Sequence, residues 1–281
     1  MKKLFGMVLC LFLAASLAQP AQFSLKLTGG MKWLNGDDYN AGIKGLNSYL
    51  KDNFAPVSGS FETLGTALHF QGELVFEIFS HFGIGLGGGY FQVNKDNTVK
   101  ATWAGGFVET FNYHPKFSVL PLFLNLHYTL PVGSRLGIDV HAGPAVFITT
   151  LDWTDSDKFV LWEESRTFSS RNTVFGFQAG LGIDLKLASA IALVLDGSYN
   201  FAKISEVKGT WTNKGWFMLW SVDDTYADSF LWYYRNTSMS GTYPMVNLGP
   251  DTPSGPGVSD ARKAVLNLSG IVLQAGFKIT L

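Results

Sequence analysis

The feature that most constrains this chain is a strict alternation of apolar and polar residues, repeated in segments of about ten residues. In the last segment the odd-numbered residues from Ile271 to Leu281 are all apolar, and the residues between them are Val, Gln, Gly, Lys and Thr. Because successive side chains of a β-strand point to opposite faces, this parity predicts a strand with one apolar and one mostly polar face. The same parity recurs, and the set predicts eight antiparallel strands: 23–33, 68–78, 84–90, 120–130, 136–146, 174–187, 191–201 and 271–281.

Short and long connections alternate between these segments. The short ones are 79–83, 131–134 and 188–190, and the long ones are 35–65, 94–116, 153–172 and 208–262. Pairing Leu187 with Ile191 leaves a three-residue turn, a favoured hairpin length. Strict alternation of this kind is typical of outer-membrane barrels, whose short turns lie in the periplasm. We therefore predict an all-β fold, an eight-stranded antiparallel up-and-down transmembrane β-barrel with long extracellular loops and both termini in the periplasm.

The N-terminus has the features of a secretory signal peptide. Lys2 and Lys3 form a basic start, the following run is apolar, and Ser16-Leu17-Ala18 has the small-x-small form of a cleavage site. The run is shorter than the ~20 apolar residues of a membrane-spanning helix. We expect residues 1–18 to be the signal peptide, with cleavage after Ala21 as the alternative, and residues 19–281 to be the barrel domain.

Composition excludes several classes of function. The net charge of −1 leaves no basic stripe of the kind that binds nucleic acid. The only cysteine, Cys10, lies in the predicted signal peptide, so the mature chain has no disulfide or thiolate chemistry. Charged residues make up only 15% of the chain and aromatic residues another 15%, a balance that suits an outer face in contact with lipid.

The alternation alone does not decide which face points inward. A soluble sandwich or lipocalin-like barrel would have the same parity with its apolar face inside. The glycines favour the membrane interpretation, because they crowd the polar face at 85, 87 and 89 and again at 176, 180 and 182, as a narrow lumen requires. The apolar face carries bulky Leu, Phe and Tyr, as expected against lipid.

Charged side chains recur on the polar face. The interior of an eight-stranded barrel is only wide enough for side chains to fill it, and buried charges need partners. We therefore predict a paired ionic network that fills the lumen, with a proton or ion route as the alternative, and with Lys26, Lys186 and Lys278 near the periplasmic end. The predicted members are Lys26, Glu73, Glu77, Asp139, His141, Asp184, Lys186, Asp196 and Lys278, and Lys32 stands on the same face.

His127 and His141 are expected to face inward on adjacent strands, with Asp139 two residues from His141. A His–Asp pair can orient a catalytic base, but a hydrolase also needs an activated nucleophile, and nothing marks the inward candidates Ser118 and Ser198 as activated. None of the five histidines forms a ligand-spaced cluster with another in the sequence. We therefore predict no catalytic residue, no metal site and no cofactor.

Two of the long connections carry patterns of their own. In the first, Asp38 or Asn40 is a candidate cap for a short amphipathic helix that rests on the barrel rim. Its apolar face within residues 41–51 consists of Ile43, Leu46, Tyr49 and Leu50. In the fourth, residues 214–222 and 228–237 read as two strands around a turn at 223–225, and residues 249–257 are turn-rich and expected to be mobile. The alternative is that these two strands join the barrel and bring it to ten.

The fourth connection, 208–262, is also rich in aromatic residues. Trp and Tyr dominate binding hot spots because they supply large contact areas at low entropic cost. We predict an aromatic cluster over the barrel mouth that gates a small apolar ligand, docks an extracellular partner or only caps the lumen. Its predicted members are Trp216, Trp220, Trp232 and Tyr234.

The strand pattern and the signal peptide together resemble the small outer-membrane barrels grouped with outer membrane proteins W and X and the barrel domain of outer membrane protein A. Members commonly end in an aromatic residue, whereas this chain ends in Leu281. The resemblance implies a non-enzymatic, monomeric barrel in contact with outer-membrane lipid, with a surface or structural role or passive permeation of small hydrophobic molecules. A lipid- or peptide-processing enzyme of the outer membrane is the alternative.

Overall fold

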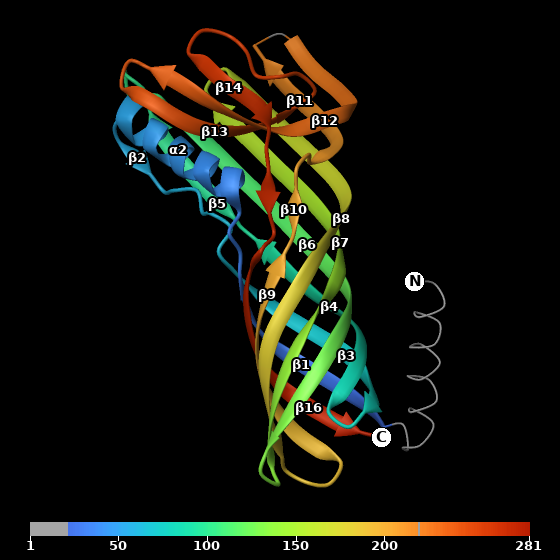
Figure 1. Ribbon diagram of the computed structural model, residues 1–281. Helices are drawn as coiled ribbons and strands as arrows, with labels where there is room; N and C mark the ends of the chain where they lie inside the picture. Colours follow the sequence, from blue (N-terminus) through green and yellow to red (C-terminus); the bar gives the residue numbers. More distant parts are fainter. Residues whose placement is uncertain (1–21, 219) are drawn as a thin grey trace.

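The computed structural model describes residues 22–218 and 220–281 (Figure 1). The predicted signal peptide, residues 1–18, lies outside the described residues. The described chain is almost entirely antiparallel β-structure. Within these two ranges, no helix is both long and apolar enough to cross a membrane.

The long strands pair in a closed ring. β1 pairs with β3 on one side and with β16 on the other, and the antiparallel pairs β3–β4–β6–β7–β8–β9–β16 complete the circle. The predicted fold class, an antiparallel up-and-down barrel, is confirmed, and each predicted segment coincides with part of one ring strand to within one residue. The ring strands are β1 (Gln22–Trp33), β3 (Thr66–Phe79), β4 (Phe82–Asn94), β6 (Val108–Val132), β7 (Leu136–Phe159), β8 (Trp162–Lys186), β9 (Ile191–Phe201) and β16 (Gly270–Thr280).

The short turns and the C-terminus share one end of the ring, here called the turn end (Figure 1). The backbone N–H of Leu187 donates to the carbonyl of Ile191 at 2.9 Å, so the predicted pairing closes the β8–β9 turn. The N–H of Leu281 donates to the carbonyl of Phe23 at 2.8 Å, which brings the last residue beside the start of β1. The opposite end of the ring is called the distal end.

The bulky residues of the alternation point out of the ring. Leu122, Leu124 and Leu126 are 45%, 48% and 53% exposed, whereas Asn125 and His127 are 0% and 4% exposed. A soluble barrel with an apolar interior would have the opposite arrangement. The apolar face therefore meets the surroundings, and the polar face lines the lumen.

The outward apolar band ends abruptly along the strands. On β7 the outward residues are apolar up to Ile148 and polar from Thr150 onward. On the paired strand β6 the same change falls between Leu120 and Ser118. The apolar stretch of each strand, which starts near the turn end, is close to the roughly 9–11 residues that a membrane-spanning strand needs.

Beyond this boundary the strands continue, so the predicted loop at 153–172 is wrong. β7 runs to Phe159, β8 starts at Trp162, and the two strands stay paired throughout. The inward residues of this extension, such as Leu151 and Trp153, are buried in an apolar core, which stabilises the paired strands. The remaining elements extend or cover this sheet: α2 (Asp37–Asn53), β2 (Val57–Ser58), β5 (Asn97–Thr102), β10 (Lys203–Ile204), β11 (Lys208–Phe217), β12 (Trp220–Ser238), β13 (Gly241–Gly249), β14 (Val258–Lys263) and β15 (Leu266–Asn267).

The aromatic connection extends the sheet instead of entering the ring. β11 pairs with the distal part of β8, and β12 pairs with β11, β13 and β14. The two strands therefore do not join the barrel wall, which excludes the alternative of two further ring strands. The turn also differs from its predicted place, because residues 223–225 lie inside β12, where Asp223 pairs with Lys214. Those residues continue the strand because β11 supplies partners for their backbone groups.

Helix α2 lies against β13 at the distal end (Figure 1). The helix was predicted, but its cap was not: Gly36 occupies the N-cap position with a φ of 70°, and no side chain caps it. Close approach to β13 requires glycine at position 45, where a Cβ would lie 1.7 Å from the carbonyl oxygen of Pro244. Asp38 accepts hydrogen bonds from Arg262 and from the backbone of Val265, which ties the start of the helix to the end of the chain.

The distal region has a core of its own, built on the inner face of the extended strands. Tyr39 of α2 is fully buried, and its ring lies 5.3 Å from that of Phe117 and 5.6 Å from that of Trp153 in edge-on geometry. The helix, the extended sheet and the β10–β15 crossing thus cover the mouth of the ring with packed apolar side chains. Further members of this core are Ile43, Leu50, Phe61, Val99, Phe147, Leu151, Phe168, Leu231, Leu248, Leu266 and Leu268.

Candidate functional site

A layer of polar side chains crosses the lumen within the apolar band. Lys26 of β1 pairs with Asp196 of β9, the strand on the other side of β16, with 2.9 Å between Nζ and Oδ2, and both side chains are buried. Gln274 of β16 donates from Nε2 to Oδ1 of the same carboxylate at 3.0 Å. Lys26 was predicted near the periplasmic end together with Lys278. The register of β1 sets it opposite Lys278 of β16 on one side and opposite Glu73 of β3 on the other, and its side chain belongs to this layer.

Two histidines and two carboxylates form the other half of the layer. His127 lies between Asp139, whose Oδ1 is 3.1 Å from Nδ1, and Glu73, whose Oε1 is 2.9 Å from Nε2. His141 lies beside His127 with ring centroids 5.4 Å apart, and its Nδ1 is 3.1 Å from Oδ2 of Asp139. Spacing along the chain does not reveal this cluster, because its residues come from different strands. The antiparallel register brings the two rings together, because His127 and His141 are direct partners on β6 and β7.

Glycines make the space that this layer occupies. A Cβ at Gly85 of β4 would lie 2.2 Å from Oε1 of Glu73 and 2.6 Å from Nε2 of His127. A Cβ at Gly180 of β8 would lie 2.5 Å from Nε2 of His141. Of the glycines on the polar face, which the sequence analysis assigned to a narrow lumen, Gly85 and Gly180 therefore face the polar layer, whereas Gly87 and Gly176 face the rings of Phe123 and Phe147. Asn125 and Gln178 extend the layer by hydrogen bonds from Asn125 to Glu73 at 2.9 Å and from Gln178 to Asn125 at 3.2 Å.

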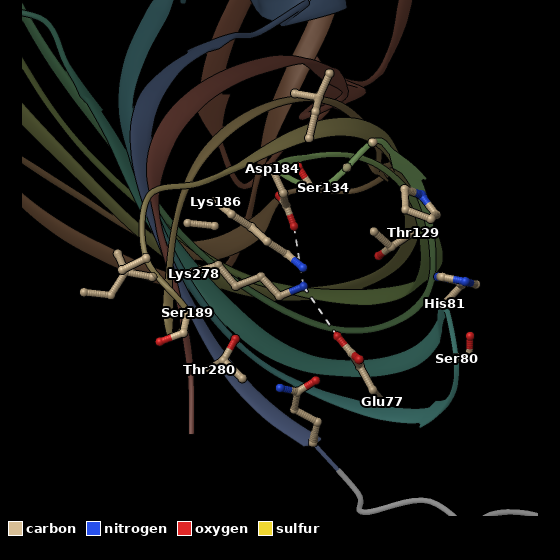
Figure 2. A pocket seen from close by; sticks show the side chains of 18 residues that line it. Glu77, Ser80, His81, Thr129, Ser134, Asp184, Lys186, Ser189, Lys278 and Thr280 are labelled. Carbon is tan, nitrogen blue, oxygen red and sulfur yellow. Dashed lines mark hydrogen bonds and ion pairs between the residues drawn. The ribbon is translucent and has the colours of Figure 1, made fainter.

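On the turn-end side of the layer, a cavity of about 340 Å³ opens at the end of the ring (Figure 2). Lys278 lies in it between two carboxylates, with Nζ 3.4 Å from Asp184 and 3.7 Å from Glu77. Lys186 lines the same cavity and is exposed. The predicted members of the lumen network thus separate into a buried central group and a solvated group at the turn end.

On the distal side of the layer, Lys32 is buried among apolar side chains. Its ammonium lies 4.4 Å from the centre of the Phe91 ring and has no hydrogen-bond partner among the described residues. His69 is likewise buried, with neither ring nitrogen hydrogen-bonded within the described part of the chain. The polar face is therefore not uniformly paired, and the lumen changes from polar to apolar toward the distal end.

No arrangement for nucleophilic catalysis is built on the His–Asp pair in the described residues. Asp139 is shared by His127, His141 and Thr129, whose hydroxyl donates to it at 3.3 Å. Ser118 does not face inward as predicted, because it has the parity of the outward residues, and it lies 3.4 Å from the hydroxyl of Tyr90. Ser198 is buried in the wall.

The four aromatic residues predicted to cluster over the mouth do not lie together. Trp216 and Trp220 are 46% and 75% exposed at the free end of the β11–β12 hairpin. Trp232 is buried, and its indole N–H donates to the carbonyl of Gly249 at 3.0 Å; Tyr234 is half-buried beside it on β12. Trp220 and Trp232 belong to one continuous strand, and a rise of ~3.3 Å per residue puts them about 40 Å apart. A single cluster of all four is therefore wrong.

An ionic group that the sequence analysis missed lies in the distal region. Nη2 of Arg166 is 2.7 Å from Asp155 and also contacts Asp157, and Nη1 is 3.8 Å from Glu164. Burial raises the pKa of Asp155 to about 7, and the neighbouring Asp157 adds to this, although Arg166 acts in the opposite direction. Burial also raises the pKa of Asp157. The β7–β8 pairing that assembles this group lies in the stretch predicted to be a loop, which is why sequence reasoning did not find it.

Comparison with family models finds a match that agrees with this architecture. The family of outer membrane protein beta-barrel domains matches residues 6–247. Among solved structures, a major outer membrane protein from Thermus thermophilus is 13% identical, over 94% of this chain and 100% of that chain, with a TM-score of 0.43. OprG from Pseudomonas aeruginosa is 11% identical, over 94% and 97% of the two chains, also with a TM-score of 0.43. Neisserial surface protein A is 11% identical, over 93% and 99%, with a TM-score of 0.37.

No curated protein matches the chain in sequence. The family match nevertheless covers most of the chain, including most of the ring strands and part of the distal extension. The apolar outer band and the closed antiparallel ring are what an outer-membrane barrel requires. The chain belongs to the family of outer membrane protein beta-barrel domains and is a bacterial outer-membrane β-barrel protein.

Proposed function

We propose that this protein is a non-enzymatic barrel with a closed lumen, whose role is to anchor and display a folded extracellular region. The observation that carries the proposal is the buried polar layer, in which ion pairs and hydrogen bonds link side chains of several strands around the lumen, as between Lys26 and Asp196 at 2.9 Å and between His127 and Glu73 at 2.9 Å. A solute moving along the axis would have to separate buried ion pairs, and breaking such a pair costs about 3–5 kcal/mol. The apolar core over the mouth supports the same conclusion.

The distal region has the properties of a displayed module. It combines α2, the strand extensions and β11 to β14 around one apolar core. Its free hairpin end carries exposed Trp216, Phe217 and Trp220, and apolar residues at such a site favour contact with a partner. We infer that the barrel contacts outer-membrane lipid as a monomer and that any partner binds on the extracellular side.

Conductance tests the closed lumen directly. Purified protein in planar bilayers should give no current steps, and liposomes containing it should exclude small sugars. The matched variant Lys26→Ser/Glu73→Ser/His127→Ser shortens three side chains of the layer and should increase ion leakage if it folds, as judged by circular dichroism. Regular current steps from the wild-type protein would refute the proposal.

Permeation of small hydrophobic molecules through the wall is a second candidate. One observation favours it: the pairing of β4 with β6 is interrupted between Gly88–Leu122 and Phe91–Val119. A groove on the outer wall lies at this interruption and includes Phe70. This route predicts uptake of a hydrophobic dye into liposomes without any ionic conductance. The first proposal, a closed barrel that anchors the distal region, predicts neither dye uptake nor conductance.

Surface exposure and catalysis can be tested on the same preparations. Protease added to intact cells should cut within residues 208–262 and spare the turn at 188–190. The purified protein should hydrolyse neither lipid nor peptide substrates. Hydrolysis that disappears in His141→Ala but persists in His114→Ala, a change at an exposed histidine, would favour an outer-membrane enzyme instead.

A further inference from the structure

The strongest unassigned feature is the group of His127, Asp139 and His141 in the lumen. One ligand atom from each residue can be chosen so that all lie within 4.8 Å of one another, and all three residues are buried. We propose that this group is a binding site for a divalent transition-metal ion, with Zn²⁺ as the ion that fits best. The inference does not depend on whether the lumen conducts.

The donor atoms are of the type that zinc prefers. Two imidazole nitrogens and a carboxylate oxygen form a common set of protein ligands for Zn²⁺, which takes four ligands in tetrahedral geometry. A water molecule would take the fourth position, because the nearby Asp196, whose Oδ2 is 3.6 Å from Nδ1 of His141, is held by Lys26 at 2.9 Å. Mg²⁺ and Ca²⁺ favour oxygen ligands only, so the two histidines select against them. Ni²⁺ and Cu²⁺ also suit imidazole ligands and should bind as well.

A carboxylate also orients one of the histidines. Glu73 accepts from Nε2 of His127 at 2.9 Å, which keeps a proton on that nitrogen. A metal ion would take the place of the proton between Nδ1 and Asp139, whose Oδ1 is 3.1 Å away. Histidines that bind metal ions commonly donate their other N–H to a carboxylate in this way. Glu73 is itself buried and held by Asn125 at 2.9 Å, so the ring orientation is set by the barrel wall.

The charges of the layer favour a bound cation. Three buried carboxylates, those of Glu73, Asp139 and Asp196, face one ammonium group, that of Lys26. With neutral imidazoles this is a formal charge of 1 − 3 = −2, which a divalent ion balances. A charge away from water is costly unless it is compensated, so the layer needs either a bound cation or protons on its histidines. Lys26 stays paired with Asp196, and Asp139 is therefore the carboxylate that both histidines share.

The cavity at the turn end gives an ion access to the site. Thr129 lines this cavity (Figure 2). Its hydroxyl donates to Oδ1 of Asp139 at 3.3 Å. Asp184 and Glu77 stand at the same opening, so the path is lined by carboxylates as well as by Lys278. We infer that the ion enters from the periplasm, which the turn end faces.

Metal binding to the purified full chain in detergent tests the proposal. After treatment with a chelator, the wild-type protein should bind one Zn²⁺ by calorimetry, and Co²⁺ should give the visible bands of a tetrahedral site. Asp139→Asn and His141→Ala should weaken binding by more than about 100-fold, and Glu73→Gln by about 10–100-fold, as for other residues that orient a ligand. The matched control is His114→Ala, because His114 makes an exposed pair with Asp96 at 2.9 Å and should not affect binding. His81→Ala, at the cavity wall, should also leave binding unchanged.

A second measurement needs no variant of the layer. Pulsed electron paramagnetic resonance of Cu²⁺ bound to the wild-type protein should detect two coordinated imidazoles. Zn²⁺ should also raise the unfolding temperature of the wild-type protein, because an ion that binds only the folded state stabilises it. Failure of the wild-type chain to bind any of these ions at millimolar concentration would overturn the proposal. Binding that is lost in His81→Ala or His114→Ala and retained in His141→Ala would overturn it too.

Discussion

The membrane band and the distal region are built on the same strands, yet they bury side chains of opposite chemistry. On β7 the inward residues Asp139 and His141 lie in the polar layer, whereas Phe147, Leu151 and Trp153, further along the same face, lie in an apolar core. The outward residues change in the reverse sense, from apolar residues such as Val146 to polar residues beyond the boundary. The same strand therefore has its apolar residues outward in the membrane band and inward in the distal region.

The difference follows from what surrounds each half of the strand. In the band, the apolar side chains contact lipid, and glycines and paired polar groups fill the lumen. In the distal region water surrounds the sheet, so folding needs an internal apolar core, which α2 completes with Tyr39. Closure of the ring satisfies the backbone in both environments.

The largest expected effect is on the distal core. Trp153 is 3% exposed and packs against Tyr39 and Tyr113, so Trp153→Ala should cost the distal region about 3–5 kcal/mol. Hydrogen exchange should rise in α2 and in the β7–β8 extension, while the strands of the band stay protected. Trp216→Ala, at an exposed position, is the control and should change stability by less than about 0.5 kcal/mol. Equal losses from the two changes would show that the distal region has no such core.

A charge introduced on the outer face should lower the stability of the protein much more in the membrane band than in the distal region. Leu122→Arg lies in the lipid-facing band and should destabilise the barrel by about 2–4 kcal/mol in lipid vesicles. Thr154→Arg is at an outward, exposed position beyond the boundary and should cost less than about 0.5 kcal/mol. Urea unfolding of both variants measures the difference, and similar costs would contradict the assigned boundary.

A third expected effect is a pH dependence confined to the distal region. Burial raises the pKa of Asp155 from 3.8 to about 7, so the folded state binds this proton more tightly than the unfolded state does. The resulting stabilisation is complete below about pH 4 and is lost as the pH rises through about 7. Proteolysis of the distal region should therefore be slower at pH 5 than at pH 8, with protease activity normalised. Asp155→Asn should reduce the difference in proteolysis rate between pH 5 and pH 8, and Asp223→Asn, an exposed control, should not change it. The same difference in both variants would rule out Asp155 as its source.

Much of the ring could be predicted because its signal is local. The parity of residues such as Leu122 and Leu124 identifies the strands, and short turns such as that from Leu187 to Ile191 fix which strands are neighbours. The distal extension was missed because its outward residues are polar and its inward residues apolar, so a search for membrane strands stops at the boundary. The change between Ile148 and Thr150 was visible in the sequence and could have revealed it.

The candidate site was only partly accessible to sequence reasoning. Parity placed Asp139, His141 and Lys26 in the lumen, but which of them meet depends on the stagger of strands that lie far apart in the chain. The pairing of Lys26 with Asp196 and the contact of His127 with Glu73 are long-range consequences of ring closure. The aromatic prediction failed for a related reason, since composition alone did not show that Trp220 and Trp232 belong to one long strand.

The inversion along β7 can be measured directly by spin labels at single cysteines, since the chain has only one cysteine, Cys10, to replace. A label at Val146 should be accessible to oxygen dissolved in lipid, and one at Thr154 to a water-soluble nickel complex. A label at Leu151 should be accessible to neither, because the distal core buries that side chain. Lipid contact at Thr154, or water contact at Leu151 in a folded protein, would contradict the account.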